Sequence, residues 1–173
     1  IEFRLRNLIE PNSTTINLQK VTSCGLRECL VKVREASGWD ERRANLPPGK
    51  GLGVAVSAYL SGTATTMWHP DLPHSGAHVQ LDRGGGVTVF CGSAEIGQGS
   101  DNLLAAIVAE ELGVLPEDVR VVTGDTGLTP VDIGSYSSRV TFMSGNAVLK
   151  ATASLREQLF EVASEVLEVP PDQ

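Results

Sequence analysis

Residues 93–101, Ser-Ala-Glu-Ile-Gly-Gln-Gly-Ser-Asp, carry the side chains best suited to holding a polar ligand. They lie between an apolar segment, 86–90, and a helix that apolar periodicity predicts at 101–112. Glycine lets the backbone approach a ligand closely, and the first amides of a helix have no partner inside it. A phosphate suits such amides, and the edge of a heterocycle suits a glutamine, which both donates and accepts hydrogen bonds. The alternative is a strand-to-helix turn that binds no ligand. The candidate binding residues here are Gly97, Gln98, Gly99, Ser100 and Asp101.

A second loop, 134–141, reads Gly-Ser-Tyr-Ser-Ser-Arg-Val-Thr and also leads into a predicted helix. Its hydroxyls, amides and arginine could surround an anion, because arginine is the usual bidentate partner of phosphate. The alternative is a serine-rich cap for the helix that follows. The loop lacks the Gly-x-Ser-x-Gly pattern of a nucleophile elbow, so a serine hydrolase is disfavoured. The candidate binding residues are Ser135, Ser137, Ser138, Arg139 and Thr141.

Other polar clusters are weaker candidates. His69, His74 and His78 fall within ten residues, but their irregular spacing does not favour a metal site. Asp125 and Asp132 lie in one loop and are interpreted as turn residues that bond to nearby backbone. No catalytic or metal-ligating residue is therefore assigned in this sequence.

Composition excludes several classes of function. The chain has 173 residues, 41% of them hydrophobic, and a net charge of −7, so a nucleic-acid surface is not expected. No apolar run is long enough to predict a membrane span. The odd cysteine count, Cys24, Cys29 and Cys91, fits no zinc or iron–sulfur spacing, and we expect reduced, buried thiols in a cytoplasmic protein.

The pattern of elements predicts an α+β fold in which a small mixed sheet packs with helices, including a long C-terminal helix at 138–167. We expect a helical arm or linker at 1–50 and a ligand-binding lobe at 51–173. The first residues are already helical and lack methionine, so we expect a piece of a longer polypeptide. The remaining predicted elements are helices at 2–9 and 24–37 and strands at 51–60, 77–81, 86–90 and 119–122, of which 77–81 and 86–90 form a hairpin.

With both loops in view, the chain resembles the large, molybdenum-binding subunit of the xanthine oxidase family. Four separated motifs carry the resemblance, in the order that the family has them. Within the family, the sequence of the loop at 134–141 is similar to that of 4-hydroxybenzoyl-CoA reductase α subunits. The motifs are Ile-Glu-Phe-Arg-Leu-Arg-Asn at 1–7, Glu-Ile-Gly-Gln-Gly at 95–99, Val-Thr-Gly-Asp-Thr at 122–126 with Thr129-Pro130, and 134–141 with Gly145-Asn146-Ala147.

The resemblance implies a molybdenum–molybdopterin cofactor, in bacteria often in its cytosine dinucleotide form. Gln98 would bond to the pterin or its phosphate region, and Ser137 would lie nearest the metal in the second loop. The family's catalytic glutamate belongs to a segment outside this chain, which alone should be inactive. Implied partners are the rest of the molybdenum subunit, iron–sulfur clusters and FAD on other domains or subunits, and an aromatic, heterocyclic or aldehyde-type substrate. The alternative from the residues alone is a non-catalytic nucleotide- or phosphate-binding module.

Overall fold

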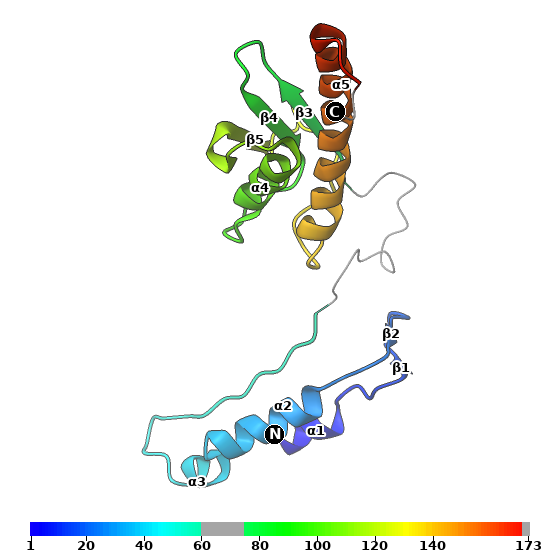
Figure 1. The fold of residues 1–173 in the computed structure, drawn as a ribbon. Coiled ribbons are helices and arrows are strands. Elements are labelled where there is room, and N and C mark those ends of the chain that lie inside the picture. Colours follow the sequence, from blue (N-terminus) through cyan, green and yellow to red (C-terminus); the bar gives the residue numbers. More distant parts are fainter. Residues whose placement is uncertain (60–74, 171–173) are drawn as a thin grey trace. The chain divides into compact units, whose positions relative to one another are not determined.

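The computed structural model describes residues 1–59 and 75–170, in two compact units, Ile1–Tyr59 and Leu60–Gln173 (Figure 1). Each unit is described by itself. The division after Tyr59 lies close to the boundary expected near residue 50, and the assignment of a separate arm and lobe stays a prediction.

The first unit combines short helices with a two-stranded sheet, and Leu30 and Trp39 are its buried apolar side chains. Gly38 adopts a left-handed conformation between the second and third helices, which lets the chain turn sharply there. The strand predicted at 51–60 was wrong over its described part, because residues 51–59 form no strand. An apolar segment becomes a strand only when a neighbouring strand pairs with it. The elements are α1 (Glu2–Arg6), β1 (Ser13–Thr14) paired antiparallel with β2 (Lys20–Val21), α2 (Leu26–Ala36) and α3 (Trp39–Ala44).

The second unit contains a three-stranded mixed sheet in the order β3-β4-β5. β3 (Ala77–Leu81) and β4 (Val87–Cys91) form the predicted antiparallel hairpin. The Asp82 carboxylate accepts bonds from the amides of Gly84 and Gly86 in its turn. β5 (Val119–Thr123) follows a short 3₁₀ turn, η1 (Pro116–Asp118), and runs parallel to β4. The mixed sheet is therefore confirmed.

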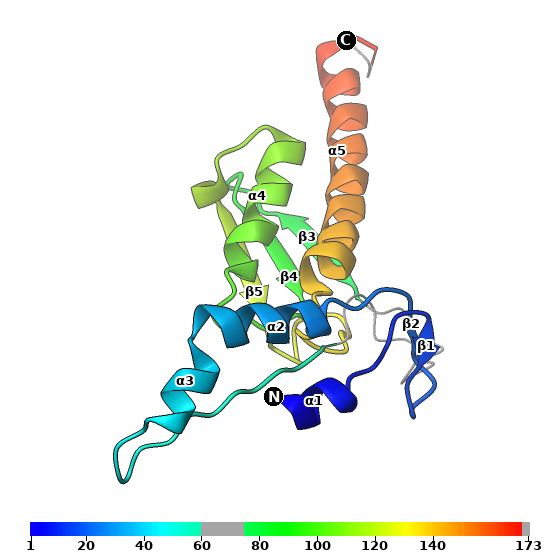
Figure 2. The same cartoon turned by 90° about the horizontal axis from the view of Figure 1, so that it is seen from below.

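Two helices pack on one face of this sheet. α4 (Ser100–Leu112) and α5 (Gly145–Leu167) lie side by side, with α4 also against β5 and α5 against β3 (Figures 1 and 2). Alternate residues of β4 point to one face, and this period places all three of its buried side chains in the core. The core comprises Val87, Val89, Cys91, Leu104, Ala105, Val108, Ala109, Val119 and Val148. The α+β class and the long C-terminal helix are confirmed.

The long helix does not begin at residue 138 as predicted. A π-helical turn, η2 (Val140–Ser144), comes first, and the regular α-helix starts at Gly145. The wider turn buries both Val140 and Ser144 while Phe142 is exposed. π-helical turns are frequent beside functional sites, and this one directly follows the second candidate loop.

Both candidate loops leave the same edge of the sheet. β4 and β5 are parallel, and Cys91 pairs with Thr123 at their carboxyl ends. Ala77, at the start of β3, pairs with Cys91 in the same row. Ligands of open α/β sheets bind outside the carboxyl ends of the strands, so this edge is where a site is expected.

Candidate functional site

A pocket of about 290 Å³ lies between the two loops. It brings Gln98 of the first loop together with the second loop, as the sequence predicted for a shared ligand. The remaining candidates of the first loop, including the buried Ser100, do not line this pocket. The lining residues are Ile96, Gln98, Ser135, Tyr136, Ser137, Ser138, Arg139, Val140 and Thr141.

Ser135 joins the two loops. Its hydroxyl donates to the Ala94 carbonyl oxygen at 2.7 Å and accepts from the Ala94 amide at 2.9 Å. One side chain thus bonds to both backbone groups of a residue 41 positions away. These two bonds hold the start of the second loop against the first loop at Ser135.

Glu95 is exposed, and its carboxylate accepts four hydrogen bonds from the first loop and the start of α4. Its Oε1 accepts from the amides of Gly97 at 2.7 Å and Gly99 at 3.0 Å. Its Oε2 accepts from the Asp101 amide at 3.2 Å and the Ser100 hydroxyl at 3.3 Å. The backbone bonds from Asp101 and Gly99, above all, lower the pKa of Glu95 to about 2, so the carboxylate is ionised at neutral pH.

Glu95 was not among the predicted site residues. The N-cap residue of α4 is Gly99, and the carboxylate that accepts from the first turn of this helix is that of Glu95. The left-handed conformations of Gly97 and Gly99 let the loop curl around that carboxylate. A glutamate shortly before Gly-x-Gly at a helix start was the available signal.

Gln98 and Asp101 are both bonded within the protein. The Gln98 Nε2 donates to the Ala94 carbonyl at 3.0 Å and to the Ser100 hydroxyl at 2.9 Å, and its Oε1 accepts from the Ile96 amide at 2.6 Å. The Asp101 carboxylate accepts from the Thr123 hydroxyl at 3.1 Å. Gln98 is nevertheless exposed at the pocket, whereas the Asp101 carboxylate ties α4 to the end of β5.

The second loop contains two consecutive serines in the left-handed region. Ser137 and Ser138 each have a φ of 54°, where non-glycine residues are disfavoured by about 1 kcal/mol or more. Ser137 is buried and Ser138 is exposed. Such strain persists only where the surroundings impose it, and it concentrates at ligand sites.

A buried ion pair imposes this loop conformation. Arg139 Nη1 lies 2.6 Å from Asp132 Oδ1, and both side chains are fully inaccessible to solvent. Nη1 also donates to the Gly134 carbonyl, while Nη2 donates to the Ser75 hydroxyl at 2.9 Å. Asp132 further accepts from the Gly134 amide and from the hydroxyls of Ser75 and Ser144. These contacts direct the guanidinium toward Asp132, and the predicted role of Arg139 toward a ligand anion remains a proposal.

The two loop aspartates behave differently. Asp125 accepts a bond from the Gly127 amide at 2.8 Å, as expected of a turn residue. Asp132 makes the matching bond to Gly134, but its pairing with Arg139 was missed. No local pattern marks an ion pair between residues seven apart in a loop.

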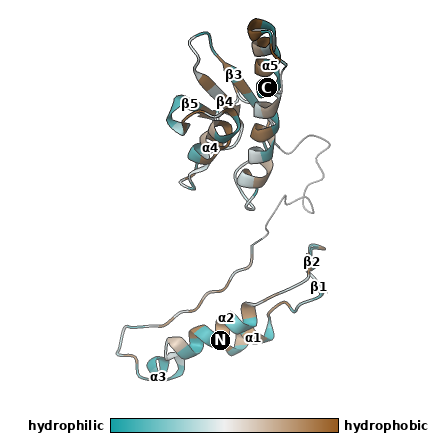
Figure 3. Ribbon diagram, viewed as in Figure 1, coloured by the Kyte–Doolittle hydropathy of each residue, from teal (hydrophilic) through white to brown (hydrophobic). Residues whose placement is uncertain are grey.

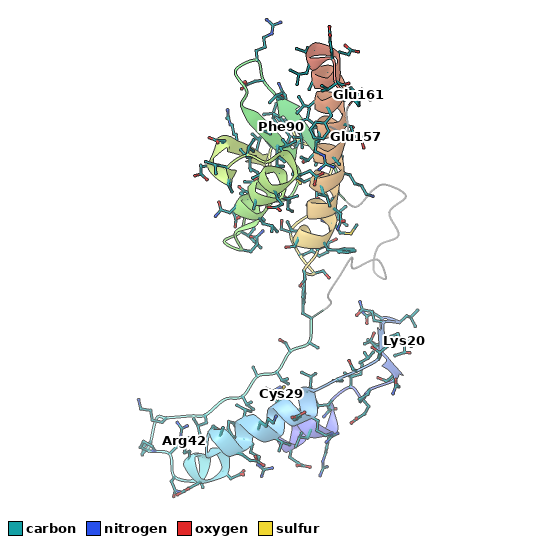
Figure 4. All side chains as sticks on the ribbon, viewed as in Figure 1. Lys20, Cys29, Arg42, Phe90, Glu157 and Glu161 are labelled. Atoms are coloured by element: carbon teal, nitrogen blue, oxygen red, sulfur yellow. The ribbon has the colours of Figure 1, made fainter. Side chains whose placement is uncertain are left out.

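The remaining polar candidates form no site in the described residues. His78 lies in β3, and His69 and His74 lie outside the described residues. Over 1–59 and 75–170 there is no group of three or more side chains that could hold a metal. The cysteines are free thiols, but of the three only Cys91 is buried as expected. Cys24 is half-buried, and Cys29 is exposed on α2 (Figure 4). None of the helices in this part of the chain combines the length and hydropathy needed to span a bilayer.

Comparison with known proteins gives the family. A family model described as a molybdopterin cofactor-binding domain matches residues 32–173. The xanthine dehydrogenase molybdenum-binding subunit of Escherichia coli O157:H7 is 35% identical over 96% of this chain and 23% of that protein. The 6-hydroxypseudooxynicotine dehydrogenase complex subunit gamma of Paenarthrobacter nicotinovorans is 46% identical over 79% of this chain and 16% of that protein.

Two solved structures of oxidoreductases are also similar to this chain. The quinoline 2-oxidoreductase of Pseudomonas putida 86 is 27% identical with a TM-score of 0.57, covering 99% of this chain and 23% of that one. The aldehyde oxidoreductase of Desulfovibrio desulfuricans is 28% identical with a TM-score of 0.58, covering 90% of this chain and 17% of that one. This chain thus spans less than a quarter of the length of these relatives. The alternative of a non-catalytic nucleotide- or phosphate-binding module has no support among them, and the chain belongs to the molybdopterin cofactor-binding domains of xanthine dehydrogenase- and aldehyde oxidoreductase-type subunits.

Proposed function

We propose that this chain supplies one part of the cofactor cradle in a molybdenum-dependent oxidoreductase, and that the pocket between its two loops receives part of molybdopterin. The observation that carries the proposal is the pocket itself, in which Gln98 meets the second loop. The two loops come from different strands and were each expected to hold a polar ligand.

The lining of the pocket fits such a ligand. Ser135, Ser138 and Thr141 offer hydroxyls that can donate or accept, and Ile96 and Val140 offer apolar surface for a ring. Ser137 is the member of the loop proposed to lie nearest the metal. Arg139 pairs with Asp132 and so holds the second loop in place. We propose that it also contacts the cofactor. When bound, the cofactor supplies the redox-active metal of the reaction.

We also propose finer features of the enzyme, which the family resemblance implies. We propose the cytosine dinucleotide form of the pterin, a cytoplasmic location, and partner domains or subunits that carry iron–sulfur clusters and FAD. One relative is named as a subunit of a dehydrogenase complex, which supports an assembly of several chains. The substrate class is aromatic, heterocyclic or aldehyde-type, and the acid–base residue comes from the remainder of the molybdenum subunit.

The proposal is tested by the molybdenum and pterin content of the full-length subunit purified in its complex. Ser138→Gly removes a pocket hydroxyl while relieving a left-handed φ, so we expect the fold to be kept and cofactor content to fall severalfold. Asn12→Gly is the matched control, because Asn12 is also left-handed (φ 58°) but lies in the first unit. Absence of pterin from the wild-type complex would contradict the proposed function. Full cofactor content in the Ser138→Gly variant would contradict the role of Ser138 alone.

A further inference from the structure

We infer that Glu95 is a positioning residue for Gln98: its carboxylate holds the first loop in the shape that presents Gln98 to the cofactor. This inference rests on the proposed function. No sequence motif assigned Glu95 a role, and its side chain does not line the pocket.

The bonds of Glu95 bracket Gln98 along the chain. The amide of Gly97 donates to Oε1 just before Gln98, and the amide of Gly99 donates to the same oxygen just after it. The other oxygen accepts from the first turn of α4, at the Asp101 amide. The backbone of Gln98 is thus held on both sides by one carboxylate, which is itself tied to a helix.

A relay through Ser100 also sets the orientation of the Gln98 carboxamide. The Ser100 hydroxyl has one proton and donates it to Glu95 Oε2 at 3.3 Å. Its lone pairs are then left to accept from Gln98 Nε2 at 2.9 Å, and the Ile96 amide donates to Gln98 Oε1 at 2.6 Å. A carboxylate at position 95 can only accept, so it favours one of the two orientations of the Gln98 carboxamide.

The same carboxylate also occupies backbone amides of the loop that could otherwise donate to a ligand. The amides of Gly97, Gly99 and Asp101 already donate to Glu95. An anionic ligand would have to displace a carboxylate of this chain to reach them. The first loop therefore acts on the cofactor through Gln98, whose geometry Glu95 sets.

A double-mutant cycle in the full-length complex tests this inference. The four proteins are wild type, Glu95→Gln, Gln98→Ala and the double variant, each measured for the dissociation constant of the cofactor and for Tm. Glu95→Gln keeps the size of the side chain but introduces donors that compete with Ser100, which frees the Gln98 carboxamide to reorient. We expect each single variant to weaken cofactor binding about tenfold and the double variant to be no weaker than either. Tm reports whether each variant keeps the fold.

If Glu95 acts on the cofactor through Gln98, the two losses in cofactor binding do not add, whereas independent roles of the two residues would make these losses add. Additive losses in binding would overturn the inference. Glu117→Gln, an exposed glutamate in η1, is the control and should match wild type in both. Should Glu95→Gln fail to fold, Glu95→Asp takes its place in the cycle, because it keeps the charge on a shorter side chain. Wild-type protein without pterin would contradict the proposed function, whereas pterin-bound wild type with an additive cycle contradicts only this inference.

Discussion

At the scale of single residues, two carboxylates of the chain occupy places that the sequence suggested for a ligand anion. Glu95 accepts from the loop amides and from the start of α4. Asp132 pairs with Arg139. Sequence patterns reveal donors such as glycine-rich amides and arginines, but the acceptor that each donor meets depends on the folded loop.

The ion pair between Asp132 and Arg139 predicts a large loss of stability when it is broken. Asp132→Asn would leave the buried guanidinium without its counter-charge, and we expect the free energy of unfolding to fall by about 3–5 kcal/mol. Asp125→Asn is the matched control, since Asp125 makes the same kind of turn bond at the surface, and should cost less than about 1 kcal/mol. Urea unfolding of the full-length subunit measures both, and equal losses would show that the pair adds little.

Glu95 predicts a specific dependence of stability on pH. Its pKa is lowered from 4.5 to about 2 in the folded chain, so its ionised form stabilises the fold above about pH 4.5. That contribution is lost as the pH falls from 4.5 toward 2, where the folded carboxyl takes up a proton. We expect Tm to fall more steeply over this window in wild type than in Glu95→Gln, as measured by calorimetry. Parallel curves for the two proteins would contradict the assignment.

At the scale of elements, the site depends on a close approach between the end of β4 and the loop that follows β5. A Cβ on Gly92 would lie 2.8 Å from the Cβ of Asp132 and would also meet the Pro130 carbonyl. The loop that contains Asp132 therefore rests directly on the backbone at Gly92. Through this contact, the ion pair of Asp132 and Arg139 is held next to the end of β4, at the sheet edge where the pocket lies.

Gly92→Ala should therefore push that loop away from the sheet. We expect a loss of about 1–3 kcal/mol in unfolding free energy, together with reduced cofactor content, because the backbone must shift to admit a methyl group. Gly127→Ala is the control, since a Cβ there meets only the flexible Asp125 carboxylate, at 3.3 Å. Unfolding and pterin analysis of the two variants should differ clearly, and a silent Gly92→Ala would contradict the close approach.

The elements with local signals were predictable, and those fixed by distant contacts were not. The hairpin of β3 and β4, α4 and β5 follow from apolar periodicity and turn residues. The absence of a strand at 51–59 depends on pairing, and the π-helical turn depends on how Val140 and Ser144 pack. The residue types predicted Gln98 and the second loop, which line one pocket, as binding residues, and that role stays a prediction. Glu95 and Asp132 were missed because their partners are set by loop geometry.

At the scale of the whole molecule, the far end of α5 is more apolar than an isolated helix surface should be. Val162, Val166 and Leu167 are 60%, 75% and 66% exposed, and Figure 3 colours this end as hydrophobic. Glu157 and Glu161 extend from the same helix and are exposed, so α5 also carries charged side chains in contact with solvent (Figure 4). Since relatives are more than four times longer than this chain, we expect the rest of the molybdenum subunit to cover the apolar side.

Replacing Val162 and Val166 tests whether this end of α5 is covered in the full-length subunit or stays in solvent. Val162→Ser with Val166→Ser barely changes helix propensity but removes apolar area, so binding of a hydrophobic dye by the 173-residue chain should fall without loss of helix content. In the full-length subunit the same pair should lower the free energy of unfolding by about 1.5 kcal/mol per valine, because each side chain would be buried there. Glu157→Gln with Glu161→Gln is the control and should leave the full-length protein unchanged. Equal stability of the valine variant and wild type in the full-length subunit would mean that this end of α5 stays in solvent. The covering segment would then have to be sought over Phe142 in η2 and Leu149 near the start of α5, which are also exposed.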